Sequence, residues 1–263
     1  MDLGLANKIA LVAASSKGLG KAVALGLARE GANTIICARN SDTLAATAHE
    51  IQQVTGQEVL AVPTDLTDYS QVQNLVSKAI ETFGKVDILI TNNGGPPSGT
   101  FLDFSVEDWK HAIDLNLMST IYLCKEVIPH MLKQKWGRII MITSVSVKQP
   151  LQDLILSNVT RSGVAGLAKS LSNELGKHNI LVNQVCPGYT STERVEQISK
   201  ALAEKQGTTP EEIIHGWANR NSLGRLATPA EFANVVVFLA SSKASHLTGV
   251  TIQVDGGLTK SLL

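Results

Sequence analysis

Seven short runs of apolar, mostly β-branched residues recur along this chain, separated by longer stretches with helical patterning. The runs lie at residues 9–13, 34–38, 58–62, 86–91, 138–143, 181–185 and 251–254. The helical stretches lie at residues 18–30, 41–54, 69–83, 105–133, 156–177 and 229–241. This alternation predicts an α/β fold, a doubly wound parallel sheet of seven strands with helices on both faces. Strands that are covered on both faces appear in a sequence as nearly continuous apolar runs, as these do.

Composition excludes several classes of protein. The chain has 263 residues, 44% of them hydrophobic and 17% charged, which is enough to bury a large core and excludes a disordered chain or a disulfide-stapled miniprotein. Lys plus Arg and Asp plus Glu both number 23, and a formal net charge of +0 argues against a nucleic-acid partner. The six histidines are scattered without ligand spacing, so no metal site is expected.

The cysteines and the first residues indicate a cytoplasmic protein. Cys37, Cys124 and Cys186 have apolar neighbours and form no CxxC pair, which predicts reduced, buried thiols. The start of the chain lacks a basic region followed by an apolar segment of signal length. The longest apolar stretches, 9–14 and 235–240, are far shorter than a membrane span, so no membrane partner is expected.

Residues 190–226 interrupt the alternation of strands and helices. The segment is polar, contains Gly207, Pro210 and Gly224, and includes two short helix-like stretches. An insertion of this length in a compact domain is usually a lid or a binding loop. We therefore expect a substrate lid at about 190–226 within a single domain that spans residues 1–263.

A turn of small residues, Ala13–Gly20, connects the first strand to the first helix. Backbone N–H groups in such a turn can approach phosphate closely, and the dipole of the helix favours the anion. The spacing differs from the usual GxGxxG fingerprint, so a plain strand–helix turn is the alternative. Ala14 lacks the conformational freedom of glycine, and an ordinary φ is expected there unless the backbone is strained.

The end of the second strand distinguishes between two dinucleotide cofactors. An enzyme that prefers an unphosphorylated ribose carries an acid there, but residues 36–41 at the end of this strand include no acid, and the next one is Asp42. Arg39 offers a fork of donors to a 2′-phosphate, and Lys17 adds a second cation. Two basic groups from separate loops favour NADP(H), and a solvated Arg39 at a strand end is the alternative.

Further motifs follow the turn in a fixed order along the chain. They are Thr64-Asp65-Leu66, Asn92-Asn93-Gly94-Gly95, Asn116, Ser144, Pro187-Gly188-Tyr189-Thr190-Ser191-Thr192, Thr248-Gly249 and Val254-Asp255-Gly256-Gly257. With these motifs, essentially the whole chain resembles the short-chain dehydrogenase/reductase family, and within it the 3-oxoacyl-acyl-carrier-protein-reductase-like members. The resemblance implies a Rossmann-like fold, a small-molecule substrate, and a homodimer or homotetramer built on the long helices at 105–133 and 156–177.

The resemblance also implies the roles of individual residues. Asn116 and Ser144 match two members of the family's catalytic set. The residues that match its cofactor-binding positions are Ser15, Ser16, Lys17, Gly18, Leu19, Gly20, Arg39, Asn40, Asp65, Leu66, Asn92, Gly94, Arg161, Pro187, Gly188, Thr190 and Thr192.

The chain departs from the family at its catalytic YxxxK motif. The tyrosine should lie 13 residues after Ser144, where the sequence has Ser157, and the lysine position holds Arg161. No tyrosine occurs between Tyr122 and Tyr189. The tyrosine of the family protonates the carbonyl oxygen, and the serine hydroxyl is a much weaker acid than a phenol. Loss of general acid catalysis slows a reaction by roughly 10²–10⁴-fold.

Three hypotheses follow from this altered motif. The chain is an NADP(H)-dependent oxidoreductase that acts on a carbonyl or alcohol with Ser157 and Arg161 as altered catalytic residues, or a nucleotide-binding protein without catalysis, or a non-redox enzyme. In the first hypothesis the proton comes from Ser157 through a water, from Tyr189, or from the substrate. Arg161 would then hold the ribose or an acidic substrate, which Lys148 could also contact.

Overall fold

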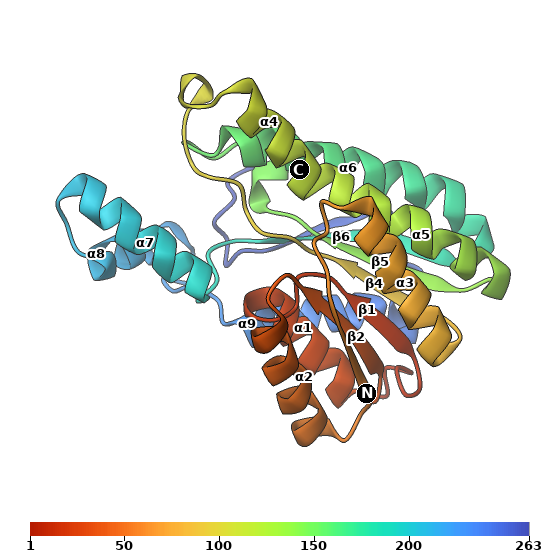
Figure 1. The fold of residues 1–263 in the computed structure, drawn as a ribbon. Coiled ribbons are helices and arrows are strands. Elements are labelled where there is room, and N and C mark those ends of the chain that lie inside the picture. The colour runs from red at the N-terminus through yellow and green to blue at the C-terminus, as the bar shows by residue number, and fades with distance from the viewer. Residues whose placement is uncertain (263) are drawn as a thin grey trace.

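The computed structural model describes residues 1–262, which form one seven-stranded parallel sheet (Figure 1). The strands are β1 (Ile9–Val12), β2 (Asn33–Ala38), β3 (Val59–Pro63), β4 (Ile88–Thr91), β5 (Gly137–Ile142), β6 (Ile180–Pro187) and β7 (Thr251–Val254). Their order in the sheet is β3-β2-β1-β4-β5-β6-β7. The predicted doubly wound, Rossmann-like sheet is therefore confirmed.

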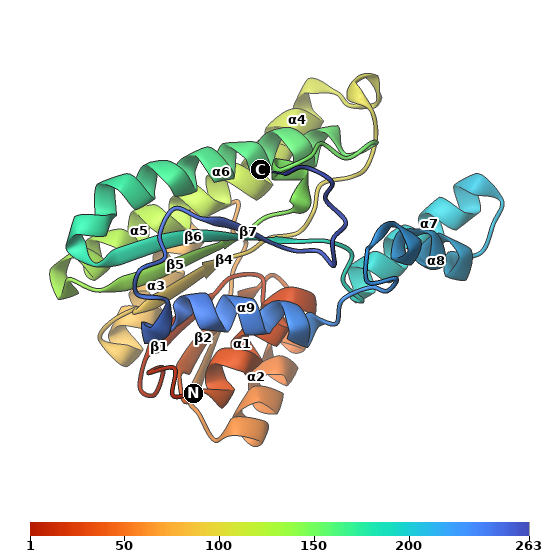
Figure 2. The ribbon, with the colours of Figure 1, turned by 180° about the vertical axis from the view of Figure 1, so that it is seen from behind.

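Helices cover both faces of the sheet (Figures 1 and 2). One face packs against α1 (Gly18–Arg29), α2 (Ser41–Thr55) and α9 (Pro229–Ala240). The other face packs against α3 (Tyr69–Phe83), α5 (Ser119–Gln134) and α6 (Ile155–Leu175). Short 3₁₀ turns occur at η1 (Phe101–Asp103), η3 (Val145–Val147), η4 (Gly176–His178) and η5 (Ser242–Ala244). Among the described residues, no helix has both the length and the apolar character needed to span a membrane.

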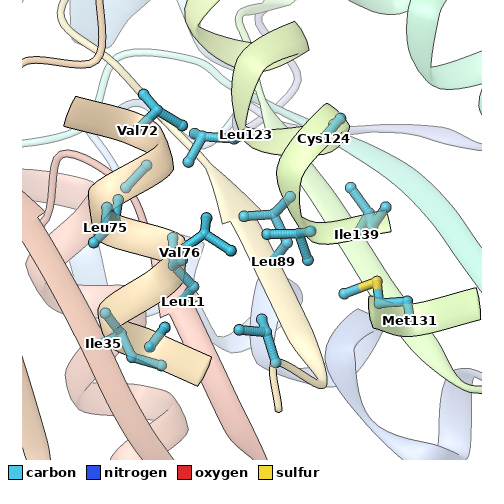
Figure 3. Close-up of a cluster of buried hydrophobic side chains, with 14 of the residues drawn as sticks. Leu11, Ile35, Val72, Leu75, Val76, Leu89, Leu123, Cys124, Met131 and Ile139 are labelled. Atoms are coloured by element: carbon cyan, nitrogen blue, oxygen red, sulfur yellow. The ribbon is translucent and has the colours of Figure 1, made fainter. Parts of the chain in front are cut away.

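The core is organised by the strict alternation of side chains along each strand. Leu11 pairs in register with Ile35 on one side and with Leu89 on the other, and Leu89 pairs with Ile139. All four side chains are fully buried, and Figure 3 shows them packed against α3 and α5. Val12, one position after Leu11, points to the opposite face and joins the core under α1 and α9. The three cysteines are free and buried, as predicted.

The stretch 105–133, predicted as one helix, is interrupted by a π-helical turn. α4 (Val106–Ile113) leads into the turn η2 (Asp114–Met118), from which α5 continues. The Thr120 hydroxyl donates to the carbonyl of Asn116 at 3.1 Å and so provides that backbone oxygen with a partner. Single π turns inside α-helices are often found at functional sites. Here the turn carries the buried Asn116.

Residues 190–226 form two helices that project beyond the edge of the sheet (Figures 1 and 2). They are α7 (Glu193–Gln206) and α8 (Pro210–Arg220), which correspond to the two helix-like stretches predicted in this segment. The helices pack on each other around Ile213 and Trp217, which form a small core separate from the two main ones. This helical pair therefore forms a subdomain with few apolar contacts to the sheet.

Candidate active site

Four loops meet at the carboxyl edge of the sheet, where they follow β1, β4, β5 and β6. These strands are neighbours in the sheet, so the loops are also neighbours. β2 and β3 lie on one side of β1, whereas β4 to β7 lie on the other. In open α/β sheets, the loops that diverge at such a reversal leave a crevice that binds ligands.

The turn after β1 is tightly closed and leaves the start of α1 open. Ala14 has a φ of 47° and Gly18 a φ of 58°, both in the left-handed region. A Cβ at Gly20 would lie 2.3 Å from the Ala14 carbonyl oxygen, so only glycine fits. The Ser15 hydroxyl donates to a β1 carbonyl at 2.7 Å and accepts from a β2 N–H at 3.2 Å. Lys17, at the N-cap, makes no side-chain cap, and the first N–H groups of α1 are therefore available to an anion.

The loops after β2 and β3 bring Arg39 close to Asp65. The pKa of Asp65 is lowered, chiefly because the Thr67 N–H donates to its carboxylate and also because the Arg39 charge lies nearby. Arg39 itself is exposed. The Asn40 side chain instead caps α2, since its Oδ1 accepts from the Thr43 N–H at 2.9 Å. The exposed Arg39 side chain is therefore accessible to an anion, whereas the Asn40 side chain caps α2.

The first turn of α7 contacts two of the loops at this edge. Glu193 forms an ion pair with Lys17 at 3.0 Å, in which both side chains are more than 60% exposed. Arg194 Nη2 donates to the Pro96 carbonyl at 3.5 Å, in the loop after β4. The Thr192 hydroxyl caps α7. The predicted phosphate cation Lys17 is thus paired with the segment at 190–226, which the sequence did not indicate.

Several residues predicted for cofactor binding also make contacts that stabilise the fold. Leu19 and Leu66 pack against the two main cores. The carbonyl of Ser16 accepts from a hydroxyl of α2 at 2.8 Å. A Cβ at Gly188 would lie 2.8 Å from the backbone that follows β7. The Thr190 backbone pairs with the segment before α9, and its buried hydroxyl has no partner among the described residues.

Three asparagine side chains connect the loop after β4 with its neighbours. Asn92 Nδ2 donates to the Ala14 carbonyl at 3.2 Å, and Asn93 Nδ2 donates to the Asn116 carbonyl at 3.2 Å. Asn116 Nδ2 in turn donates to the Gly94 carbonyl at 3.4 Å. The Oδ1 atoms of Asn93 and Asn116 are buried without a partner among the described residues. Asn93 was not among the predicted site residues, although its place beside Asn92 in the sequence was a signal.

The predicted catalytic residues gather where α6 packs against η3 and η2. Ser144 caps η3, since its hydroxyl accepts from a backbone N–H at 3.1 Å. Ser157 and Arg161 lie one turn apart on α6 and are both 8% exposed. Arg161 Nη1 donates to the Ile142 carbonyl at 3.5 Å. Burial lowers the pKa of Arg161 to about 10, so the guanidinium remains charged at neutral pH.

A cavity of about 400 Å³ lies beside this cluster. The Tyr189 ring stacks on Trp217, with ring centroids 4.8 Å apart and an interplanar angle of 6°. Burial raises the pKa of the Tyr189 phenol, and the neighbouring Arg220 opposes this shift. The Lys260 N–H donates to Gln149 Oε1 at 3.0 Å and holds the C-terminal segment in place. The cavity is lined by Val145, Gln149, Leu151, Tyr189, Asn219, Arg220, Leu258, Thr259 and Lys260.

The sequence matches known oxidoreductases over nearly its full length. A family model described as enoyl-(acyl carrier protein) reductase matches residues 13–259. Oxidoreductase UcpA of Salmonella typhimurium is 37% identical over 258 residues, which cover 97% of this chain and 95% of that protein. The 3-oxoacyl-[acyl-carrier-protein] reductase FabG of Aquifex aeolicus is 33% identical over 98% of this chain and 100% of that protein. This chain belongs to the short-chain dehydrogenase/reductase family.

Solved short-chain dehydrogenase/reductase structures share the whole fold. L-sorbose reductase from Gluconobacter frateurii, complexed with NADPH and L-sorbose, superposes with a TM-score of 0.96 at 33% identity and covers 100% of both chains. YwfH, an NADPH-dependent reductase involved in bacilysin biosynthesis, has a TM-score of 0.93 at 28% identity and covers 98% of this chain and 100% of its own. The resemblance of the motifs to this family is therefore confirmed.

Sequence reasoning did not identify Arg220 and the segment 258–260 as parts of the site. They follow no motif and reach the cavity only because α8 and the residues after β7 fold back over η3. Among the described residues, no group of three or more His, Cys, Asp or Glu side chains could hold a metal ion.

Proposed function

We propose that this chain is an NADP(H)-dependent oxidoreductase that interconverts a carbonyl and an alcohol on a small molecule. The proposal rests on two features of the carboxyl edge of the sheet. The N-terminus of α1 has no side-chain cap, and Arg39 lies near Asp65 at the ends of β2 and β3. The open N–H groups suit a pyrophosphate, and the exposed guanidinium suits a 2′-phosphate. The NADPH named for the L-sorbose reductase and YwfH structures supports the same cofactor here.

The cofactor-binding residues proposed from the sequence are those of five loops, at the ends of β1, β2, β3, β4 and β6, and Arg161. The backbone of Ser15–Gly20 would hold the pyrophosphate, and Lys17 would turn from Glu193 to the 2′-phosphate. The Asp65–Leu66 backbone would hold the adenine. When bound, NADPH supplies the hydride. The residues of α7 and α8 would close over it as a lid, which the contacts of Glu193 and Arg194 with the loops after β1 and β4 support.

The altered catalytic group is the second part of the proposal. Ser157 and Arg161 occupy the positions of the family's tyrosine and lysine, and both are buried on one face of α6. Arg161, which remains charged, would hydrogen-bond the ribose hydroxyls. Ser144 would donate a hydrogen bond to the substrate carbonyl, and Asn116 would hold the η2 turn in place. Tyr189, whose ring lines the cavity beside Arg220, is the phenol available as a proton donor.

A fluorescence titration tests the cofactor. We expect the wild type to bind NADPH more tightly than NADH, and Arg39→Ala to weaken NADPH binding by roughly 10–100-fold, the range for a hydrogen bond to a charged group. NADH binding should be unchanged. The matched control is Arg29→Ala, at an exposed position on the last turn of α1, which should leave both affinities unchanged. Equal binding of both cofactors, or no effect of Arg39→Ala, would show that the cofactor assignment is wrong.

Oxidation of NADPH tests the reaction and the proton donor. The purified chain is assayed against 3-oxoacyl thioesters, quinones, sugar ketones and 2-oxo acids. Tyr189→Phe removes only a hydroxyl and should lower kcat by roughly 10²–10⁴-fold if the phenol is the acid. Ser157→Tyr combined with Arg161→Lys should increase ketone reduction if the rest of the site is intact. A Tyr189→Phe variant with normal kcat would exclude this phenol and leave Ser157 with water, or the substrate, as donor.

A second candidate function is that of a nucleotide-binding protein without catalysis. The serine at the position of the family's phenol favours it, because that hydroxyl is a poor acid. Tight NADPH binding without turnover of any carbonyl compound in the panel would support this function against the first.

A further inference from the structure

The cavity beside Ser144 has positive charge on its wall and no negative charge. Arg220, at the end of α8, and Lys260, after β7, both line it. The other polar side chains on the wall include the amides of Gln149 and Asn219, and none of the described lining residues is acidic. Within the described chain, no carboxylate lies within ion-pair distance of Arg220 or Lys260. Lys260 Nζ donates to the Gly257 carbonyl at 3.0 Å, so in the described part of the chain neither cation is paired with a carboxylate.

Two further cations lie on the neighbouring side of the site. Lys148 and Arg161 both act on the buried thiol of Cys186, where they favour the thiolate against the effect of burial. The carboxylate of Asp255, shortly before the wall residues 258–260, accepts from the N–H groups of Gly257 and Thr259 at 3.0 and 2.8 Å. The charged side chains named on the wall and beside Cys186 are therefore all positive.

Such a set of cations is stabilised when an anion enters. Arg220 and Lys260 are exposed, and a ligand that covers them would leave two buried, unpaired charges unless it is an anion, so an anionic ligand is favoured over a neutral one. A guanidinium matches the two oxygens of a carboxylate in a bidentate pair. The remaining wall residues include Val145, Leu151 and Leu258, which suit a compact organic body. A volume of about 400 Å³ lies in the range of small-molecule sites.

On the basis of the proposed oxidoreductase function, we infer that the substrate is a small oxo acid or hydroxy acid whose carboxylate is held by Arg220 and Lys260. The carboxylate lies at the outer end of the cavity, away from Arg161. The carbonyl then faces Ser144, which precedes the wall residue Val145.

Binding of matched acids and amides tests this inference without any turnover. Isothermal titration calorimetry measures pyruvate, phenylpyruvate, 4-oxopentanoate and 2-oxoglutarate against their amides, with and without NADP⁺. At least one acid should bind 10-fold or more tightly than its amide, and more weakly as salt is raised. Arg220→Gln should raise the Kd of that acid roughly 10-fold or more, the range for a charged hydrogen bond, and leave the Kd of its amide unchanged. Arg29→Gln, on the exposed last turn of α1, is the matched control.

The outcomes separate this inference from the proposed function. If no acid binds more tightly than its amide, or if Arg220→Gln weakens acid and amide equally, the inference is wrong. If an acid binds through Arg220 but none of the acids is reduced by NADPH, the inference holds and the assigned reaction is wrong. If neutral ketones are reduced with a higher kcat/KM than every oxo acid, the reaction stands and the inference is overturned. Circular dichroism of each variant checks that it is folded.

Discussion

Replacing Ala14 by glycine tests whether the phosphate turn holds its backbone under strain. Ala14 has a φ of 47°, a conformation that costs an L-residue about 1–2 kcal/mol and glycine almost nothing. Glycine also gains freedom in the unfolded chain, which costs about 0.4–1 kcal/mol. The methyl group of Ala14 is only partly buried, and its loss costs less than the ~0.8 kcal/mol of a fully buried carbon. These terms sum to a change in the free energy of unfolding of about −1 to +1.5 kcal/mol for Ala14→Gly, centred on ~0.5 kcal/mol of stabilisation.

The neighbouring Ala13 provides a matched control in the same turn. Ala13 is fully buried and is not among the residues with a positive φ, so glycine there releases no strain. Ala13→Gly should lower the free energy of unfolding by about 1–2 kcal/mol, from the same unfolded-chain term and a fully buried methyl. In a chain of this size, about 2 kcal/mol between the variants separates their Tm values by roughly 4–8 °C. Thermal unfolding followed by circular dichroism measures the Tm of each variant. An equal fall in Tm for Ala14→Gly and Ala13→Gly would refute the assignment of strain to Ala14.

Three further predictions concern the turn, an ion pair and the contact of α7 with Lys17. Gly20→Ala should abolish NADPH binding in a fluorescence titration and lower Tm, because the added methyl would lie 2.3 Å from a carbonyl of the same turn; normal binding would contradict the tight closure. The pKa of Glu231 is lowered to about 2, chiefly by Arg225, so its contribution to stability is present above the ordinary pKa of 4.5 and is lost as pH falls towards 2. Arg225→Ala should return that pKa towards 4.5 in an NMR titration, and an unchanged pKa would exclude the ion pair. Glu193→Gln should free Lys17 and tighten NADPH binding more than NADH binding, and equal effects on both would show that Lys17 does not meet the 2′-phosphate.

The sequence predicted the sheet well because strands that are buried on both faces need apolar side chains at nearly every position. Runs such as 86–91 and 138–143 are mostly apolar, each with one charged residue near its start and a threonine at its end; β4 lies within the first, and β5 overlaps the second except for its first residue. The π-helical turn at Asp114–Met118 left no such trace, since it preserves the helical pattern of apolar residues and alters only the backbone bonding. The left-handed Ala14 was also not predicted, because strain at one residue is maintained by the rest of the turn.

The candidate site was predictable only where its residues belong to a recognisable motif or lie at a fixed spacing from one. Ser144 could be located by counting from β5, whereas Arg220 and Lys260 could not, because only the folding of distant segments brings them to one cavity. The Lys17–Glu193 pair likewise joins positions separated by most of the chain. Residue type does not indicate which arginine or lysine will make such a long-range contact, since exposed arginines and lysines occur over the whole surface.

The strand order has a consequence for the chain as it leaves the ribosome. β1, β2, β3 and β4 are adjacent in the sheet and are synthesised first, so the nucleotide half can assemble while the rest is still being translated. The outer edge of β6 has no partner until β7 emerges, and the cavity wall at 258–260 follows later still. A nascent chain that stalls between them would display an unpaired, apolar edge of the kind that chaperones bind, while the cavity still lacks its wall at 258–260.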